Sequence, residues 1–338
     1  MSTRLGIVIV SYDNGEDIAK LVENIRPQLR TGDKLIIVDN KKPYQLTKFL
    51  DSSGIKADII KHDNGGFGAG CNVGAAAVQD QVDVLLFLNP DTYTEQSDYL
   101  DRMRRGYGEF DAWQSLLLLP NGRINSYGNN VHITGLTWSD RFGLQPPQER
   151  LHRLIHNLSG ACLAIDVQWW QRIGGFTEAY FMYFEDVDLS TKLLITGAKL
   201  GILEDAELRH NYDFEKGTHK WLYLERNRQL FMLINWPARL LILTLIPNLL
   251  FNVVIFLQYL AKGRGLLKLK ADWLFLKSIP LGLRLRRERR ALWKITPKAY
   301  FHTIGYAMNT NLLGKITDNK VVFTVMWLYY RVVGLFFI

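Results

Sequence analysis

The sequence predicts an α/β fold with a mainly parallel sheet, followed by a basic and hydrophobic C-terminal region. Four short β-branched or leucine-rich runs recur in the first ninety residues, helical spacing separates the first two runs, and polar residues follow each run. Strand, helix and strand in alternation predict parallel strands joined by right-handed crossovers. A ligand site is then expected at the carboxyl ends of the strands.

The expected strands are apolar runs that end in polar residues, at 5–10, 34–38, 58–61 and 82–88. Between the first two, an apolar stripe predicts a helix with Asn14 as its cap. The stripe consists of Ile18, Leu21, Val22, Ile25 and Leu29. A second helix is expected at about residues 69–78, directly after a group of glycines.

The strand and helix alternation ends after Asp101. Turn residues at 120–122 and 127–130 predict antiparallel hairpins that build a second wall. One more strand is expected over 158–165, followed by a tight turn at 174–176. A further helix is expected to begin at about residue 185 and to end near Gly197, with a strand after it that leads to His210.

The composition predicts an ordered, globular chain. Its 338 residues are 48% hydrophobic and 22% charged, which allows two domains or one large domain with an extension. The two cysteines, Cys71 and Cys162, are too few for a disulfide framework or a cysteine-rich zinc module, and a reducing, cytosolic setting is expected. Residues 5–10 are too short an apolar run for a secretory signal and are interpreted as a buried strand.

The positive charge is concentrated near the C-terminus. The chain has a net charge of +8, and residues 262–298 carry +10, which leaves the rest at −2. A solvated basic face is one interpretation. The neighbouring runs favour a membrane, because residues 240–261 have no charged side chain and residues 321–338 have only Arg331. Crossing a bilayer takes about 20 apolar residues.

These two apolar runs allow either membrane-spanning or membrane-surface helices. The first is interrupted by Pro247, Asn248, Asn252 and Gln258, which a lipid-facing helix does not favour. Between the runs, leucine and tryptophan alternate with lysine and arginine, a composition typical of helices that lie in the headgroup layer. A nucleic-acid groove favours basic residues among polar and stacking groups instead. We therefore expect a membrane surface as partner and no nucleic acid.

Four glycines between Asn64 and Gly70 stand where the third strand turns into a helix. Bare backbone at such a turn allows close approach of a phosphate or ribose, and the helix N-terminus favours anions. The alternative explanation of these glycines is that they allow the helix to pack closely. A dinucleotide fingerprint is disfavoured, because Cys71 stands where its last glycine belongs.

Two acidic segments also follow expected strands or turns. Asp91, in Asn89-Pro90-Asp91, is placed either to hold a divalent cation that binds a diphosphate or simply to form a turn. Glu185, Asp186 and Asp188 lie at a helix start, where capping explains one or two carboxylates. Aromatic neighbours at 180–184 would desolvate a carboxylate and raise its pKa, as a general base requires. His210 either completes a metal site or is structural.

The motifs, in their order along the chain, resemble a known family. They are Ser11-Tyr12-Asp13-Asn14, Val38-Asp39-Asn40, Asn64-Gly65-Gly66-Phe67-Gly68, Leu88-Asn89-Pro90-Asp91, Gly160-Ala161, Gly174-Gly175-Phe176, Glu185-Asp186-Val187-Asp188-Leu189 and Glu225-Arg226-Asn227-Arg228. As a set they resemble the family 2 inverting glycosyltransferases of GT-A fold, in the rhamnosyltransferase-like branch. The resemblance implies a catalytic domain at 1–236 and a membrane-associated helical region at 237–338.

The resemblance also implies roles for the matching residues. Asp186 would be the base that deprotonates the acceptor hydroxyl, with Glu185 and Asp188 in support. Asp91 and His210 would hold Mg²⁺ or Mn²⁺, although Asn89 replaces the first Asp of the family's metal motif. The nucleotide sugar would contact Ser11, Tyr12, Asp39, Asn64, Gly65, Gly66, Phe67, Gly68, Asn72, Asn89, Asp91 and Gly160.

The expected function is transfer of one sugar from a nucleotide donor to a polyprenyl-diphosphate-linked saccharide at the cytosolic face of the membrane. The branch resemblance favours rhamnose from dTDP-rhamnose, and UDP-galactofuranose, UDP-galactose or UDP-glucose are alternative donors. Arg226 and Arg228 either contact the lipid diphosphate or pair with Glu225. One alternative hypothesis is an acceptor that is a protein or a soluble polysaccharide. Another is a non-catalytic scaffold that binds nucleotide sugars.

Overall fold

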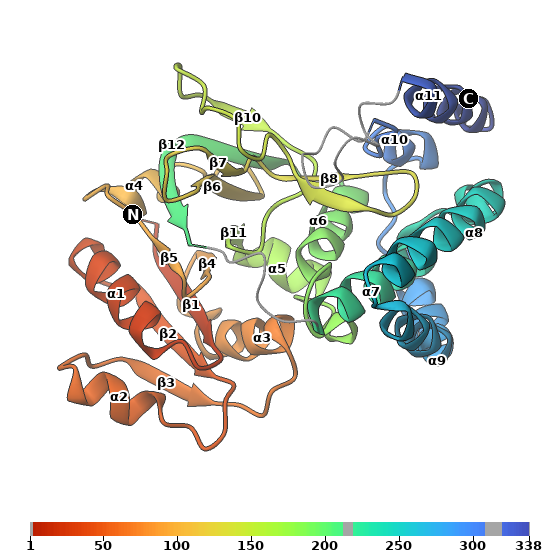
Figure 1. The fold of residues 1–338 in the computed structure, drawn as a ribbon. Helices are drawn as coiled ribbons and strands as arrows, with labels where there is room; N and C mark the ends of the chain where they lie inside the picture. The colour runs from red at the N-terminus through yellow and green to blue at the C-terminus, as the bar shows by residue number, and fades with distance from the viewer. Residues whose placement is uncertain (1–2, 212–218, 308–319, 338) are drawn as a thin grey trace. The chain divides into compact units, whose positions relative to one another are not determined.

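The computed structural model describes residues 3–211, 219–307 and 320–337, and the chain divides into two compact units (Figure 1). We call the first the sheet unit; it comprises Met1–Asn129, Ser139–Leu193 and Ala198–Phe214. We call the second the helical unit; it comprises Asn130–Trp138, Leu194–Gly197 and Glu215–Ile338. The end of the catalytic region at residue 236 stays a prediction.

Ten of the described strands form the central sheet of the sheet unit. They are β1 (Leu5–Ser11), β2 (Lys34–Asp39), β3 (Asp58–Lys61), β4 (Val84–Leu88), β5 (Thr92–Tyr93), β6 (Ala112–Leu118), β7 (Ile124–Ser126), β10 (His152–Leu154), β11 (Cys162–Asp166) and β12 (Leu200–His210). Their main order is β10-β12-β6-β11-β4-β1-β2-β3, with β5 beside β12 and β7 beside β6. The strands β3, β2, β1 and β4 are parallel, whereas β11 is antiparallel to β4 and β6. The four expected strands are therefore confirmed within a mixed sheet.

Six helices connect these strands among the described residues of this part. They are α1 (Gly15–Ile25), α2 (Leu46–Ser52), α3 (Phe67–Val78), α4 (Tyr99–Arg104), α5 (Val167–Ile173) and α6 (Glu185–Ile195). The expected stripe is buried on α1 except for Leu29, which lies beyond the end of the helix. Asn14 occupies the cap position of α1, but its side chain makes no capping bond and instead accepts a hydrogen bond from the Tyr12 N–H at 3.2 Å.

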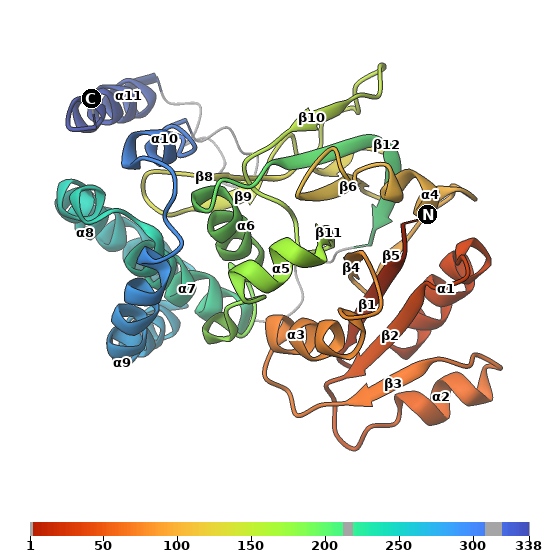
Figure 2. The ribbon, with the colours of Figure 1, turned by 180° about the vertical axis from the view of Figure 1, so that it is seen from behind.

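Successive side chains of β1 point to opposite faces of the sheet. Ile7 and Ile9 join the buried apolar cluster that also contains residues of α1 and α2. Val8 and Val10 face α3, which approaches so closely that a Cβ on Gly74 would lie 2.4 Å from Val8 Cγ1. The two views in Figures 1 and 2 show α1 and α3 on opposite sides of β1. The sheet is thus covered on both faces, as parallel strands require.

The second half of the sheet unit contains the expected antiparallel hairpin. β6 and β7 pair around the predicted turn at 120–122. The predicted turn at 127–130 is only partly correct, because β8 (Asn129–Val131) begins inside it and pairs with β9 (Thr137–Ser139) in a separate two-stranded sheet. Only Gly128 there has a left-handed φ, of 92°. The strand expected at 158–165 is present as β11, which begins later, at Cys162, and is shorter than expected.

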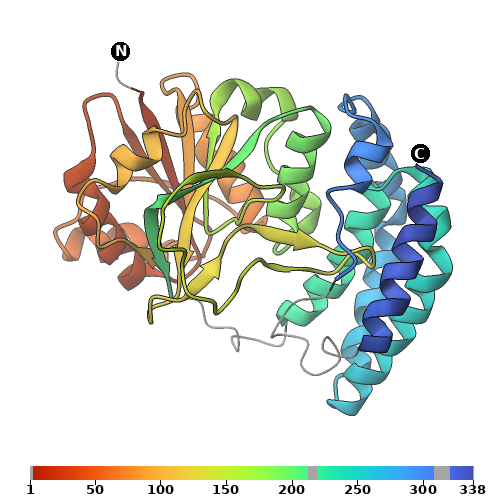
Figure 3. The ribbon, with the colours of Figure 1, turned by 90° about the horizontal axis from the view of Figure 1, so that it is seen from above.

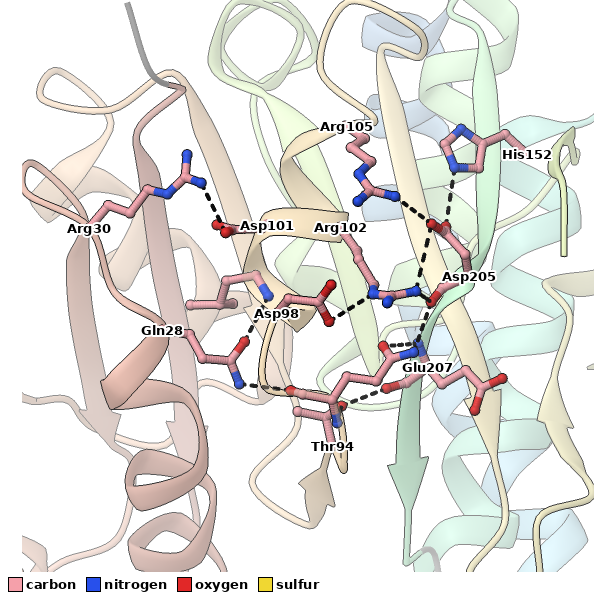
Figure 4. A network of polar contacts seen from close by, with 12 residues as sticks. Gln28, Arg30, Thr94, Asp98, Asp101, Arg102, Arg105, His152, Asp205 and Glu207 are labelled. Atoms are coloured by element: carbon pink, nitrogen blue, oxygen red, sulfur yellow. Dashed lines mark hydrogen bonds and ion pairs between the residues drawn. The ribbon is translucent and has the colours of Figure 1, made fainter.

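A network of polar side chains holds the irregular middle of β12 (Figure 4). The register of β12 against β6 shifts after Leu203, which marks a bulge. Asp205 in this bulge accepts a hydrogen bond from Arg105 Nη1 at 2.9 Å on its carboxylate and one from Arg102 Nη1 at 2.9 Å on its carbonyl. Its carboxylate also lies 3.2 Å from His152 Nε2. Side chains thus fix a strand segment whose regular backbone pairing is interrupted.

The helical unit is built around three long helices (Figure 3). They are α7 (His219–Asn235), α8 (Ala238–Ala261) and α9 (Gly265–Arg290), and the shorter α10 (Pro297–Phe301) and α11 (Lys320–Leu335) follow. Two cations of the basic segment are buried inside this unit: Lys268 pairs with Glu225 at 3.1 Å, and Arg289 donates to Asn235. The expectation that the basic residues of this segment serve the headgroup layer is therefore wrong for these two.

Among the described helices, α8 is long and apolar enough to cross a membrane. Its best window has a mean hydropathy of 2.5, and 22% of that window is buried. Ile242, Ile246 and Leu250 are exposed on it. Asn252, which seemed unfavourable in the sequence, accepts hydrogen bonds from Arg228 at 2.5 Å and Lys268 at 3.4 Å. This polar interruption therefore packs toward the other helices of its own unit.

Candidate active site

The carboxyl ends of β1 and β2 place Ser11 and Asp39 side by side, because they are register partners in the parallel pair. Both side chains are buried. The Asp39 carboxylate accepts hydrogen bonds from the Lys41 N–H at 3.1 Å and the Leu46 N–H at 3.4 Å, which fixes the loop after β2. Tyr12, next along the chain, is 57% exposed. The structure thus gathers the three residues predicted to contact the nucleoside at one edge of the sheet.

The glycine-rich loop is packed against protein at three of its glycines. Gly66 has a φ of 96°, and a Cβ there would lie 1.9 Å from the carbonyl oxygen of Phe181. A Cβ on Gly68 would lie 3.0 Å from the Cβ of Phe176, and one on Gly70 would lie 2.7 Å from a methyl of Val10. Close packing thus accounts for these glycines, and contact between this loop and a nucleotide stays a prediction.

The same loop is connected to both of its neighbours by hydrogen bonds. The Phe67 N–H donates to the Phe181 carbonyl at 2.9 Å, and Asn40 Nδ2 donates to the Gly66 carbonyl at 3.2 Å. The Gly66 N–H donates to Asn64 Oδ1 at 3.1 Å, which closes the turn. The glycine loop therefore connects the edge formed by β1 and β2 to the segment before α6.

Asn72 on α3 fastens the predicted tight turn at 174–176. Its Nδ2 donates to the Phe176 carbonyl at 3.0 Å and to Glu178 Oε1 at 2.9 Å, and its Oδ1 accepts from the Phe176 N–H at 2.8 Å. Gly174 and Gly175 both have left-handed φ angles, as that turn requires. Asn72 therefore positions this turn, and its contact with a nucleotide sugar stays a prediction.

The loop that leads into α6 has an unusual backbone. Phe181, Tyr183 and Phe184 have φ angles of 67°, 64° and 73°, in the left-handed region that non-glycine residues rarely adopt. Such conformations cost about 1–3 kcal/mol each and persist only where the surrounding structure determines them. They bring Glu185 and Asp186 to the start of α6.

Asp186 is held by three hydrogen-bond donors. Its Oδ2 accepts from the Gly160 N–H at 2.9 Å and from Asn129 Nδ2 at 3.2 Å, and its Oδ1 accepts from the Val187 N–H at 2.8 Å. The N–H of Asp186 itself also stabilises the charged carboxylate. Burial raises the pKa of Asp186, against these three donors, which stabilise its charged form. Asn129 lies in the segment 127–130 that the sequence had marked only as a turn.

Glu185 lies in a less polar environment than Asp186. It is 9% exposed, and within the described part of the chain its Oε2 has no hydrogen-bond partner. Burial, and after it the charge of Asp186, raise the pKa of Glu185 to about 8. The two adjacent carboxylates thus differ in environment, because Asp186 accepts several hydrogen bonds and Glu185 lies among fewer donors. Such a contrast is found in sites that need two groups of different basicity.

Asp188 is fully buried and holds the preceding segment to α6. It accepts hydrogen bonds from Thr177 Oγ1 at 2.6 Å and from the Tyr180 hydroxyl at 3.0 Å. The expected supporting role for Asp188 is therefore consistent with its contacts. It stabilises the loop that presents the two carboxylates before it.

Asp91, in the loop between β4 and β5, lies next to His210, the last residue of β12. Asp91 Oδ1 lies 3.3 Å from His210 Nε2, and His210 Nδ1 lies 3.1 Å from Asn125 Oδ1, an orienting contact that the sequence did not indicate. Two ligands in neighbouring octahedral positions around Mg²⁺ lie about 3 Å apart, so this pair fits a divalent cation. Within residues 3–211, 219–307 and 320–337, no three His, Cys, Asp or Glu side chains gather as a metal site, so further ligands would come from the substrate or water.

The loop that carries Asp91 adjoins the loop that holds Asp186. The Asn89 N–H donates to the Ala161 carbonyl at 3.0 Å, and the next residue back along the chain, Gly160, donates to Asp186. The predicted metal pair and the predicted base therefore belong to neighbouring loops at the carboxyl end of β4. The side chain of Asn89 is half-buried there.

Of the two arginines predicted to contact a lipid diphosphate, Arg228 has a structural role in the helical unit. It is 1% exposed and donates to Glu225 at 2.7 and 3.0 Å, to the Thr134 carbonyl at 2.7 Å and to Asn252 at 2.5 Å. These contacts occupy its guanidinium, which supports the alternative of pairing with Glu225. Arg226 is half-buried and donates to Ser278 Oγ at 2.8 Å.

Comparison with known proteins identifies the family of this chain. The family described as glycosyl transferase family 2 matches residues 6–174, which is half of the chain. The protein therefore belongs to glycosyl transferase family 2 and is a glycosyltransferase, as the resemblance predicted, and it is similar to rhamnosyltransferases among its curated relatives.

Two curated relatives are rhamnosyltransferases. The chain is 27% identical over 209 residues to the rhamnosyltransferase WbbL of Escherichia coli K12, which covers 57% of this chain and 78% of that protein. It is 42% identical over 67 residues to an N-acetylglucosaminyl-diphospho-decaprenol L-rhamnosyltransferase of Mycobacterium tuberculosis, over 19% of this chain and 22% of that protein.

Solved structures confirm the GT-A fold. The crystal structure of GalNAc-T7 with UDP, GalNAc and Mn²⁺ matches with a TM-score of 0.57 at 14% identity, over 70% of this chain and about half, 49%, of that one. The mannosyltransferase PcManGT from Pyrobaculum calidifontis, in complex with GDP-Man and Mn²⁺, matches with a TM-score of 0.50 at 11% identity, over 99% of this chain and 86% of that one. At these identities the likeness concerns the fold alone.

Proposed function

We propose that this glycosyltransferase moves a single sugar, with rhamnose from dTDP-rhamnose as the favoured donor, to a saccharide linked to polyprenyl diphosphate. The observation that carries the proposal is the Asp186 carboxylate, which is held in place by hydrogen bonds from Gly160, Asn129 and Val187. Ser11 and Asp39 lie side by side at the carboxyl ends of β1 and β2, where the nucleoside would bind. The rhamnosyltransferase relatives, one of them named for a decaprenol-linked substrate, support the donor and the acceptor.

The reaction that this site supports is a single displacement. The acceptor hydroxyl gives its proton to Asp186 while its oxygen forms a bond to the anomeric carbon of the donor. The bond from that carbon to the diphosphate breaks, and the electron pair leaves on the nucleoside diphosphate. Attack opposite the leaving group inverts the anomeric centre, and general base catalysis of this kind contributes about 10²–10⁴-fold in rate.

Asp91 and His210 would hold the divalent cation in this proposal. Mn²⁺ in the two structures of the same fold supports a cation of this type. When bound, such an ion neutralises charge on a diphosphate. Asn125 orients the imidazole of His210, and the backbone of Asn89 fixes the Asp91 loop to the loop of Gly160.

The helical unit would associate with the cytosolic face of the membrane, where a polyprenyl-linked acceptor is found. The long apolar helix α8 and its exposed leucines and isoleucines support this location. The exposed cations near the end of α9, such as Arg284 and Arg287, suit an anionic membrane surface.

Donor turnover tests the proposal directly. The full chain in detergent is incubated with dTDP-rhamnose and the three UDP-hexoses, with Mg²⁺, Mn²⁺ or a chelator, and with or without membrane lipid extract. We expect release of nucleoside diphosphate from dTDP-rhamnose, stimulated by the extract. Asp186→Asn should lower this release at least 100-fold, whereas Asp80→Asn, an exposed aspartate after α3, serves as the matched control.

Each part of the proposal has its own contradicting result. Turnover of a UDP-sugar alone would replace the donor, and stimulation by a soluble glycan without lipid would replace the acceptor. Unchanged release in Asp186→Asn would remove the base from the mechanism.

A further inference from the structure

The helical unit contains a pocket of about 310 Å³ that the transfer reaction does not use. It is formed where α7 ends, α8 begins and the end of α9 passes them. Its volume is at the lower end of the range for small-molecule sites. The residues that line it are Ile234, Asn235, Trp236, Pro237, Ala238, Arg286, Arg290, Trp293, Ile295 and Pro297.

The lining of this pocket carries positive charge without a compensating acid. Arg286 and Arg290 are one helical turn apart on α9, and the ten lining residues include no aspartate or glutamate. Arg286 Nη1 donates to the carbonyls of Leu233 and Trp236 at 2.7 and 2.6 Å, which fixes its guanidinium beside the pocket. Burial and the nearby charge of Arg290 lower the pKa of Arg286, so these two cations are close enough to repel each other.

Residues around the start of α8 supply further N–H donors. Pro237 is the cap of α8 and Ala238 its first residue, so the unpaired N–H groups of the first turn of a 24-residue helix adjoin the pocket. Trp236 is 1% exposed, and its indole N–H has no hydrogen-bond partner among the described residues. Cations, helix N–H groups and an unsatisfied buried donor all favour an anionic oxygen ligand.

The surroundings indicate what kind of molecule carries this anion. The helix that begins at the pocket is α8, whose exposed side includes Ile242, Ile246 and Leu249. Trp293 in the lining is a half-buried, amphipathic side chain that suits the boundary between headgroups and acyl chains. A lipid whose phosphate lies in the pocket would thus have an apolar protein surface beside its hydrocarbon chains.

We propose that this pocket binds the phosphate group of a membrane lipid, held by Arg286, Arg290 and the first turn of α8. The phosphate belongs either to an anionic phospholipid of the bilayer or to a lipid-linked diphosphate. The inference rests on the proposed association of the helical unit with the membrane, but it does not depend on the transfer reaction or on the identity of the donor.

Vesicle sedimentation of the full chain tests this site. The vesicles are phosphatidylcholine alone, phosphatidylcholine with 30% phosphatidylglycerol, and phosphatidylcholine with 5% polyprenyl diphosphate. R286Q/R290Q removes two cations from the pocket. R284Q/R287Q removes two cations from exposed positions of the same helix that do not line it. We expect the pocket pair to weaken binding to one of the two kinds of vesicle that contain an anionic lipid at least ten times more than the control pair does.

Single substitutions at exposed positions show whether a loss of binding could come from misfolding. Arg290 and Arg287 are both exposed, so R290Q and R287Q should unfold at the temperature of the unaltered chain, and the same difference in binding is expected between them. Loss that depends on the pocket with phosphatidylglycerol identifies a bilayer headgroup as the ligand, and loss with polyprenyl diphosphate alone identifies a lipid-linked diphosphate.

Two results would overturn the proposal that this pocket binds a lipid phosphate. Equal losses in the pocket and control variants would show general attraction of cations to the surface. Equal binding of the unaltered chain to all three vesicles would show that it does not prefer an anionic lipid phosphate to the zwitterionic headgroup of phosphatidylcholine. Failure to bind any vesicle would overturn membrane association as well, whereas nucleoside diphosphate release in detergent reports on the transferase separately.

Discussion

Replacing Glu185 by glutamine should stabilise the protein, and the gain should grow with pH. The glutamate has a pKa of about 8 in the folded chain against 4.5 in the unfolded one, because it is buried beside Asp186. Between these two values the unfolded state binds fewer protons than the folded state. Stability therefore falls as pH rises through this window, and glutamine, which stays neutral, does not incur that loss.

The size of the effect follows from the same two pKa values. Linkage gives a loss of stability of roughly 1 kcal/mol at pH 5 and roughly 3 kcal/mol at pH 7, because Glu185 keeps its proton in the folded chain while it ionises in the unfolded chain. For a unit of about 200 residues, 1 kcal/mol corresponds to about 2–4 °C in the unfolding temperature. The Glu185→Gln variant should thus gain about 6–12 °C at pH 7 and about 2–4 °C at pH 5.

Thermal unfolding of both proteins between pH 4.5 and pH 8, followed by calorimetry in detergent, measures this difference. Glu23→Gln on the exposed side of α1 is the matched control, and a surface substitution of this kind should change stability by less than about 0.5 kcal/mol. A gain that stays constant with pH, or a loss at pH 7, would refute the proposed burial of an ionisable carboxyl at residue 185.

Three further substitutions test other parts of the structure. Gly66→Ala should unfold at lower temperature and lose donor turnover, because its Cβ would meet the Phe181 carbonyl; normal unfolding would contradict this packing. Arg228→Leu should cost about 3–5 kcal/mol by leaving Glu225 buried without its bidentate partner, as urea unfolding would measure, and a neutral result would count against the pair. His210→Gln should raise the Mn²⁺ concentration for half-maximal turnover, whereas unchanged metal dependence would exclude this residue as a ligand.

The sheet and one edge of the site were predictable from the sequence because local patterns determine them. Apolar runs that end in polar residues marked β1 to β4, and the parallel register then placed Ser11 beside Asp39. The carboxylates at 185 and 186 were also found, because a helix start with more acids than capping requires is a local pattern.

The partners of these residues were not predictable, because they come from distant parts of the chain. Asn129 is 57 residues from the Asp186 that it holds, and Asn125 is 85 residues from His210. Neither lies in a pattern that distinguishes it from an ordinary turn residue. Charge composition likewise gave no sign that Lys268, among many exposed cations, is fully buried against Glu225. Side-chain pairing of this kind depends on the packing of helices that sequence periodicity does not specify.

The way α3 lies on the sheet limits how this enzyme can be redesigned for another donor. Gly66, Gly70 and Gly74 have no room for a side chain, so libraries that randomise the glycine loop would consist mostly of misfolded variants. Tyr12 is exposed at the same edge and is free to vary without disturbing the packing of α3, whereas Asn64 closes the glycine turn through its hydrogen bond with the Gly66 N–H. Directed evolution of donor preference should therefore begin at Tyr12 and keep Asn64 and the glycines constant.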